Sequence, residues 1–332
     1  MDALQSWGLT VVATLQQFSP GLDGVMRFLS FVGEEGFFAI MVPFVYWCVD
    51  AALGARLLAA LVFSDFLNGL GKLAFHAPRP YWMSPRVKAL SLEPSYGIPS
   101  GHAQTGVLFW GLVSHSLSRP WVPVAATAVV LAISLSRVYL GVHFPHDVLA
   151  GWMIGAVLLA AFIWAGPGLI RWLGARPLVA QIAAAFLLSM AMLAVLLIVH
   201  AAIAGVVDPP AWAEQAADAA PPPPGRPAIA PRSMDGPVAD LGMVFGAGAG
   251  LALGRRYARF DARGPWRHRI LRLLVGLVLL AVVRVGLAAV LPREPLVVGM
   301  TFRYLRYALI GLTALWVAPW VFLRIGIARP RS

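Results

Sequence analysis

The chain has 332 residues, of which 59% are hydrophobic and 12% are charged. Soluble domains carry about 25% charged residues, so this composition excludes an ordinary soluble protein and indicates a membrane protein. The net charge of +11 would suit nucleic-acid binding, but nearly all basic residues lie between or beside apolar runs. We therefore interpret the basic residues as determinants of membrane topology and expect no nucleic-acid partner. At about 20 residues per span, the length accommodates roughly eight or nine transmembrane helices.

The N-terminal segment, residues 1–36, alternates apolar and polar groups and carries acids at Asp23, Glu34 and Glu35. We expect it to lie in the membrane interface or to cross the membrane once. It lacks the basic start and the small-residue cleavage site of a secretory signal, so we expect it to be retained. The single cysteine, Cys48, lies in an apolar run, where packing is its expected role.

Apolar runs of spanning or near-spanning length follow along the rest of the chain. They comprise residues 37–50, 51–75, 101–118, 122–140, 147–165, 178–204, 241–257, 270–291 and 302–325. These runs predict an all-α polytopic membrane protein. Between the sixth and seventh runs, residues 207–237 are rich in proline, alanine and acids, and we expect them to form an extramembrane linker that does not order itself.

Basic residues predict the orientation of the runs. Arginines accumulate in the loops after the first, third, fifth, seventh and ninth runs, whereas acids dilute them in the other loops. Positive loops favour the cytoplasm, so residues 72–100 and 141–146 are expected to face outward together. This side is the periplasm if the cell has two membranes.

Three polar segments gather on that outward side. They are "KLAFHAPRP" at residues 72–80, "PSGHAQ" at residues 99–104 and "SRVYLGVHFPHD" at residues 136–147. Because alternating helices bring these ends to one membrane face, residues about 60 positions apart can share a pocket.

The residue types in these segments indicate phosphate binding. Arg79 and Arg137 offer planar forks that match phosphate oxygens, and Lys72 adds a compact charge. Ser100 and Gly101 begin a predicted helix, where unpaired backbone N–H groups and the helix dipole favour an anion. We expect these five residues to hold a phosphate.

Phosphoryl transfer also needs a nucleophile and a proton donor. His143 and His102 fit these roles, because a neutral imidazole can attack phosphorus and an imidazolium can protonate the leaving group. Asp147, four residues after His143, can reach back one helical turn to accept the ring N–H of that histidine. Pro145 suits the first turn of the helix that carries the aspartate.

The order and spacing of the three segments resemble the signature of the type-2 phosphatidic acid phosphatase family, which is related to vanadium haloperoxidases. "PFVYWCVD", ahead of the first segment, is similar to the bacterial branch near polyprenyl-diphosphate and sphingosine-phosphate phosphatases. The resemblance implies a metal-independent phosphatase with a six-helix-type core and a phosphohistidine intermediate. It assigns phosphate binding to Lys72, Arg79, Ser100, Gly101 and Arg137. It assigns protonation of the leaving group to His102, nucleophilic attack to His143 and orientation of that histidine to Asp147.

The resemblance also divides the chain. Residues 37–206 correspond to the transmembrane phosphatase core, and residues 238–332 form a C-terminal extension of about three further helices whose role stays open. The expected substrate is a phosphorylated membrane lipid, with a polyprenyl diphosphate or monophosphate ahead of a phosphatidate-type lipid. A haloperoxidase-like enzyme and a non-catalytic carrier or scaffold for anionic lipids are the alternatives. The oligomeric state stays open.

Two other features have competing interpretations. His146, with His143 and Asp147, suggests a zinc site, but Pro145 disturbs the helical spacing and the sequence shows no clear further ligand. We therefore expect neither a metal nor a cofactor, and a solvated or substrate-adjacent position for His146. Glycines that recur every four residues from 242 to 254 indicate a small-residue helix face, for packing within the chain or for dimerisation.

Overall fold

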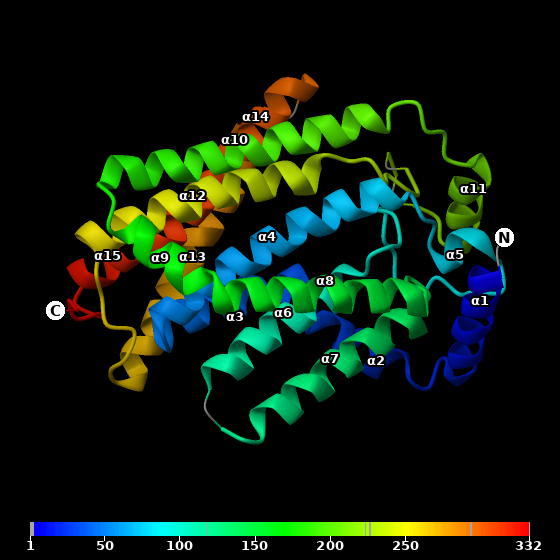
Figure 1. The fold of residues 1–332 in the computed structure, drawn as a ribbon, viewed down its shortest axis with the longest axis horizontal. Helices are drawn as coiled ribbons and strands as arrows, with labels where there is room; N and C mark the ends of the chain where they lie inside the picture. The colour runs from blue at the N-terminus through cyan, green and yellow to red at the C-terminus, as the bar shows by residue number, and fades with distance from the viewer. Residues whose placement is uncertain (1–2, 118, 223, 226, 293, 332) are drawn as a thin grey trace. The chain divides into compact units, whose positions relative to one another are not determined.

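The computed structural model describes residues 3–117, 119–222, 224–225, 227–292 and 294–331 (Figure 1). In chain order its elements are α1 (Ala3–Leu15), η1 (Gln16–Phe18), α2 (Asp23–Phe31), α3 (Glu35–Cys48), α4 (Ala51–Phe75), α5 (Pro80–Met83), α6 (Gly101–Ser116), α7 (Val122–Tyr139), α8 (Pro145–Trp164), α9 (Gly166–Gly174), α10 (Leu178–Ala202), α11 (Pro210–Ala219), α12 (Asp235–Tyr257), α13 (Trp266–Val290), α14 (Leu296–Leu312), η2 (Thr313–Val317) and α15 (Ala318–Arg324).

Each predicted apolar run forms helix, which confirms the prediction of an all-α polytopic membrane protein. Within the described residues, seven helices or continuous helix groups are long and apolar enough to cross a membrane. The number is eight if α2 and α3, which are bent by 46° to one another, count as one broken span. The predicted run at residues 101–118 forms the shorter helix α6 of 16 residues.

Contacts divide the chain into two units. The first unit comprises Met1–Phe37, Leu67–Ala160 and Leu197–Ser233, and the second comprises Phe38–Phe66, Ala161–Leu196 and Met234–Ser332. All eight predicted site residues belong to the first unit. The units group residues that lie close together in space, whereas the predicted domains are divided by changes in composition along the chain. The units therefore do not test the predicted domain boundaries, which stay a prediction.

Glycines in α8 set the position of α6 within the first unit. A Cβ atom at Gly151 would lie 2.5 Å from the carbonyl oxygen of Ser100, and one at Gly155 would lie 2.6 Å from that of Gln104. Real side chains do not tolerate such distances, so only glycine allows the two helices to approach this closely. The contact holds the N-terminus of α6 against the first turns of α8.

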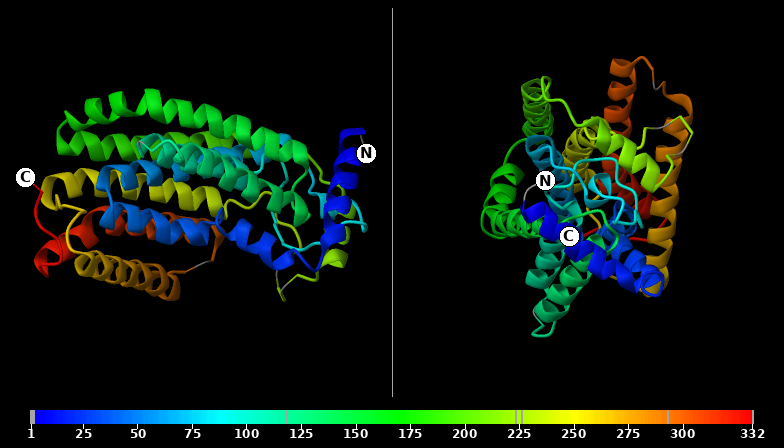
Figure 2. Two further views of the ribbon diagram at one scale, coloured as in Figure 1. Left: turned by 90° about the horizontal axis from the view of Figure 1, so that it is seen from below. Right: turned by 90° about the vertical axis from the view of Figure 1, so that its right-hand side faces the viewer.

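The N-terminal segment is fixed to two other parts of the first unit. The buried Gln16 side chain donates from Nε2 to the carbonyl oxygens of Lys88 and Tyr139, each at 2.9 Å. Its Oε1 accepts from the Lys88 N–H at 2.8 Å. Figures 1 and 2 show α1 near α5 and α11 at one end of this unit. Whether the segment crosses a membrane stays a prediction.

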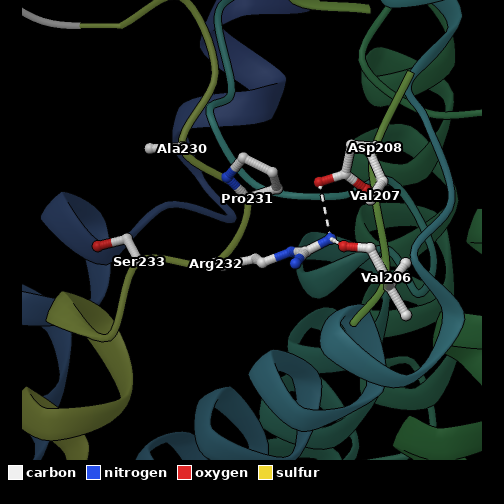
Figure 3. A pocket seen from close by; sticks show the side chains of 7 residues that line it. All are labelled: Val206, Val207, Asp208, Ala230, Pro231, Arg232 and Ser233. Carbon is white, nitrogen blue, oxygen red and sulfur yellow. Dashed lines mark hydrogen bonds and ion pairs between the residues drawn. The ribbon is translucent and has the colours of Figure 1, made fainter. Parts of the chain in front are cut away.

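The proline-rich stretch after α10 differs from its prediction, because ten of its residues form α11. Trp212 of α11 packs on Trp82 of α5 with ring centroids 6.3 Å apart. Arg232 forms an ion pair with Asp208 at 3.1 Å, and Figure 3 shows the two side chains pointing toward one another. Both side chains also bond the hydroxyl of buried Tyr96. The stretch cannot build a core of its own, but it becomes ordered by packing on the other segments of the first unit.

The second unit has an apolar core. Tyr46 and Trp47 of α3 donate hydrogen bonds to the carbonyl oxygens of Leu315 and Ala314, at 3.2 and 2.9 Å. In α12, the predicted glycine face packs against α14 and η2, where a Cβ at Gly246 would overlap the backbone of Ala308. The glycine repeat therefore brings helices of this chain together.

Candidate active site

Local sequence places each predicted site residue at a helix end of the first unit. Lys72 lies in the last turn of α4, and Arg79 precedes α5, whose first residue is proline. Ser100 caps α6, its hydroxyl accepting from the Ala103 N–H at 3.5 Å. Serine is preferred at this position because its oxygen satisfies a backbone N–H that has no partner within the helix.

The third motif brackets the turn between α7 and α8. Arg137 lies in the last turn of α7, His143 lies in the turn, and Asp147 lies in the first turn of α8 after Pro145. The backbone N–H of Ser100 donates to the carbonyl oxygen of Asp147 at 3.0 Å. A backbone hydrogen bond therefore joins the second and third motifs directly.

His143 and Asp147 form a buried pair. Nδ1 of His143 lies 3.3 Å from Oδ2 of Asp147, and the same oxygen accepts from the Phe144 N–H at 2.9 Å. Their side chains are 2% and 0% exposed. The turn therefore holds the carboxylate in place against the ring.

Arg79 defines the tautomer of this histidine. Its Nη1 lies 3.3 Å from Nε2 of His143. A guanidinium has only donors, so Nε2 must be the unprotonated nitrogen and Nδ1 carries the proton toward Asp147. The lone pair of the ring therefore points away from the aspartate and toward the arginine.

Backbone carbonyls hold Arg79 itself. Nε donates to Ser95 O at 2.6 Å, Nη1 to Val142 O at 2.7 Å and Nη2 to Tyr96 O at 3.0 Å. The hydroxyl of Ser95 accepts from Nζ of Lys72 at 2.9 Å and from Nη2 of Arg79 at 3.1 Å. The loop at residues 95–96 thus joins the two cations of the first motif.

Arg137 has partners from two further segments. Nη1 donates to the hydroxyl of Ser30 in α2 at 2.6 Å, and Nη2 pairs with Oε1 of Glu93. Nε of Arg137 and Nε2 of His102 are buried, and neither makes a hydrogen bond to any described residue. Such atoms are uncommon in native structures, and both are suited to contact a bound anion.

The start of α6 lies against a polar side chain of α4. A Cβ atom at Gly101 would lie 3.0 Å from Oδ1 of Asn68. Nδ2 of Asn68 donates to Pro99 O at 3.2 Å and to Oε1 of Gln104 at 3.0 Å. Asn68 therefore fixes the second motif, and a side chain at position 101 would require Asn68 to shift by a few tenths of an ångström.

Charges set the protonation of two groups outside the membrane-spanning segments. Burial and the positive charges of Arg79 and Arg137 hold the pKa of His143 well below its usual range. Burial opposes ionisation of Glu93, but the charge of Arg137, then those of Arg79 and Lys72, outweighs it and holds the pKa of Glu93 below its usual range. At neutral pH the site therefore contains a neutral His143 and an ionised Glu93.

His146 contacts the buried pair of His143 and Asp147 through the aspartate. Its Nε2 is 3.4 Å from Oδ1 of Asp147, and its ring stacks on Phe144 with centroids 5.0 Å apart. Among the described residues no group of three or more histidine, cysteine, aspartate or glutamate side chains is arranged to hold a metal ion. His146 therefore contacts the second oxygen of the aspartate that bonds His143.

Sequence reasoning missed four side chains that contact the predicted residues. Ser30, Asn68, Glu93 and Ser95 all lie outside the three motifs. The sequence carries a signal for two of them, because the run "LEPSYG" at residues 92–97 places a carboxylate and a hydroxyl between two motifs. Ser30 and Asn68 carry no such signal because their contacts depend on the tertiary fold.

Two family models match this chain. The family model described as "PAP2 superfamily" matches residues 53–171, and the one described as "PAP2 superfamily phosphatase, transmembrane extension" matches residues 238–330. Together they cover both the three motifs and the C-terminal helices.

Curated relatives share parts of the chain. Glucose-6-phosphatase 3 of Mus musculus is 30% identical over 183 residues, covering 48% of this chain and 53% of the relative. Sphingosine-1-phosphate phosphatase 2 of Homo sapiens is 35% identical over 144 residues, covering 41% and 35%. Undecaprenyl-diphosphatase of Sulfolobus acidocaldarius is 31% identical over 138 residues, covering 41% and 66%. The chain thus spans about half the length of the glucose-6-phosphatases that it matches.

Among solved structures, the transmembrane PAP2 type phosphatidylglycerolphosphate phosphatase from Bacillus subtilis is 24% identical, with a TM-score of 0.42 over 48% of this chain and 84% of that chain. The resemblance that the motifs predicted is confirmed by the family matches. The chain belongs to the PAP2 superfamily, and its phosphatase domain is followed by the transmembrane extension of that superfamily.

Proposed function

We propose that this protein is an integral membrane phosphatase that hydrolyses a phosphate monoester or diphosphate of a lipid through a phosphohistidine at His143. The observation that carries the proposal is the orientation of this ring. Nδ1 faces Asp147, and the Nε2 lone pair faces Arg79 in a buried site with further cations. A neutral imidazole held in this tautomer is a nucleophile.

In the first half of the reaction, Nε2 of His143 attacks phosphorus and the bond from phosphorus to the leaving oxygen breaks. His102, protonated when the negative charges of the phosphate are bound beside it, gives a proton to that oxygen, so the alcohol or lipid monophosphate leaves with one proton added. Asp147 supports the positive charge that develops on the His143 ring. Lys72, Arg79, Arg137, the hydroxyl of Ser100 and the backbone N–H of Gly101 at the start of α6 stabilise the charge on the phosphoryl oxygens.

In the second half, water attacks the phosphohistidine. His102, now neutral, accepts a proton from this water, the bond from nitrogen to phosphorus breaks, and inorganic phosphate leaves. Both histidines return to their starting protonation states. This scheme uses only side chains and backbone groups of the chain itself and needs no metal or other cofactor.

A lipid substrate suits a site at helix ends. The tail can stay in the bilayer while the phosphate enters the polar site. Two of the relatives are named for sphingosine-1-phosphate and undecaprenyl diphosphate, which are lipids, and this supports a lipid. The relatives named for glucose 6-phosphate make a water-soluble ester the competing substrate class.

We further propose that the protein lies in the cytoplasmic (inner) membrane and that the site opens on the extracytoplasmic face. The support is the arginine distribution between alternate loops. Reporter fusions at Pro221 and at Arg259 test this orientation. The fusion at Pro221 is expected outside and the fusion at Arg259 inside, and the reverse result would place the site in the cytoplasm.

The experiment that tests the function is phosphate release by the purified protein in detergent. The panel contains undecaprenyl diphosphate and monophosphate, phosphatidate, sphingosine 1-phosphate and glucose 6-phosphate. We expect release from at least one lipid, retained in His115→Ala, an exposed histidine of α6 in the same unit, and lost in His143→Ala. Unchanged release in His143→Ala would refute the nucleophile, and release from glucose 6-phosphate alone would refute the lipid.

A further inference from the structure

Glu93 lies among the cations of the predicted phosphate site. Its Oε1 pairs with Nη2 of Arg137, and its Oε2 lies 4.0 Å from Nη2 of Arg79. The arginine side chains are 1% and 0% exposed, whereas that of Glu93 is 26% exposed. One partly exposed carboxylate thus lies within ion-pair distance of two buried arginines.

We infer that Glu93 is a displaceable counterion that takes the place of the phosphate between Arg79 and Arg137, leaves when substrate phosphate enters, and returns to expel inorganic phosphate. This inference deepens the proposed function and rests on it, because it concerns the same pocket. It assigns to Glu93 a part in substrate admission and product release that the three motifs do not include.

The arginines do not need Glu93 to hold their positions. Arg79 donates to three backbone carbonyl oxygens, and its distance to Glu93 exceeds that of a hydrogen bond. Arg137 is fixed at Nη1 by Ser30. The cations therefore stay in place when the carboxylate leaves.

The backbone of Glu93 is anchored, so its departure involves the side chain. The Tyr81 hydroxyl in α5 donates to Glu93 O at 3.0 Å and accepts from Glu93 N–H at 3.1 Å. A glutamate side chain has three rotatable bonds, and this side chain is partly exposed. Rotation about these bonds moves the charge while the loop stays fixed.

Carboxylate and phosphate compete for the same geometry. Both are oxyanions that the arginine fork binds through charge-assisted hydrogen bonds. They repel each other, so the two cannot occupy the pair of arginines together. A phosphate ester carries more negative charge than a carboxylate and displaces it, but the tethered carboxylate is always present at high effective concentration. After hydrolysis it competes with the product for Arg137 and shortens the time that inorganic phosphate stays bound.

The test is binding of inorganic phosphate to the purified full chain in detergent, measured by calorimetry and by phosphorus NMR. In Glu93→Gln the carboxylate charge is gone, and we expect phosphate to bind on the order of tenfold more tightly and to inhibit hydrolysis at correspondingly lower concentration. Glu35→Gln, which removes an exposed carboxylate of the same unit, should bind phosphate as the unmodified protein does. Glu93→Asp keeps the charge on a shorter side chain, and we expect tightening of about twofold to threefold.

Equal or weaker phosphate binding in Glu93→Gln would overturn the inference, since the carboxylate would then not compete with phosphate. If that variant does not fold, Glu93→Asp decides, and binding unchanged or weaker than that of Glu35→Gln overturns the inference. Failure of the proposed function gives a different result. It would appear as absent phosphate release from the whole panel, whereas failure of this inference leaves release and its dependence on His143 intact.

Discussion

Both units contain a buried arginine, and the partners of the two arginines differ. Arg137 of the first unit bonds a serine hydroxyl and a partly exposed glutamate. Arg272 of the second unit is fully buried and donates to the carbonyl oxygens of Asp261, Ala262 and Arg263 at 2.6, 2.8 and 3.2 Å. The three partners of Arg272 are backbone carbonyls of one loop, which Arg272 stabilises, whereas Glu93, one of the two partners of Arg137, is a side chain that a ligand can replace. Arg79 also donates to three backbone carbonyls, but it differs from Arg272 in its contact with His143. Burial of an arginine is therefore no guide to function until its partners are known.

The largest expected effect is a loss of activity on changing the site of the first unit. Asp147→Asn keeps the size of the side chain but removes the charge that orients His143, so kcat should fall about 10⁴-fold. The measurement is steady-state phosphate release, with thermal unfolding of the same preparation as its control. A loss below tenfold in a stably folded protein would show that the aspartate does not support the nucleophile.

Arg137→Lys should give the next largest loss. Lysine keeps the charge but not the fork, so we expect kcat/KM to fall about 10²-fold while the unfolding temperature changes little. Activity and thermal unfolding together check this expectation. A variant that unfolds but shows full activity per folded molecule would make Arg137 a structural residue like Arg272.

Arg272→Met should show the reverse behaviour. It leaves three backbone carbonyl oxygens without their donors and should lower the free energy of unfolding by about 2–4 kcal/mol. Activity per folded molecule should be unchanged. The matched control is Arg267→Met at an exposed position of the same helix, where a change within about 0.5 kcal/mol is expected. A loss of activity in stable Arg272→Met would remove the distinction between the two arginines.

The smallest expected effect is on the pH dependence of activity, where the acid limb of kcat/KM should be shifted to lower pH. The lowered pKa of His143 means that its neutral form persists below pH 6.5, the ordinary value for histidine. Protonation removes the nucleophilic lone pair, so the part of the acid limb of kcat/KM that belongs to His143 should lie below that pH. An acid limb centred at or above pH 6.5 that moves when His143 is replaced would contradict the assignment.

The sequence predicts the helices and the charged motifs well, and the reason is physical. Long apolar runs have few alternatives to helix in a membrane, so each one forms helix in the structure. The motif residues lie at the helix ends expected from their spacing, and Asp147 reaches His143 across one turn. Roles of the individual residues stay proposals.

Contacts made by the fold itself could not be predicted. Ser30 reaches Arg137 from a segment whose sequence suggests only an amphipathic or spanning helix. Glu93 resembles any acid of a polar loop until its two arginines are located. Helix α11 orders through packing of Trp212 on Trp82, which composition does not show. In each case the missing information is which distant residue provides the partner.

The measurement that tests the central claim most directly is oxygen-18 exchange between inorganic phosphate and water, followed by phosphorus NMR. A phosphohistidine forms from inorganic phosphate by loss of water and breaks down by its addition, so the protein should catalyse exchange without any lipid substrate. We predict exchange by the unmodified protein and by His115→Ala, and none by His143→Ala. Exchange that persists undiminished in His143→Ala would contradict the account.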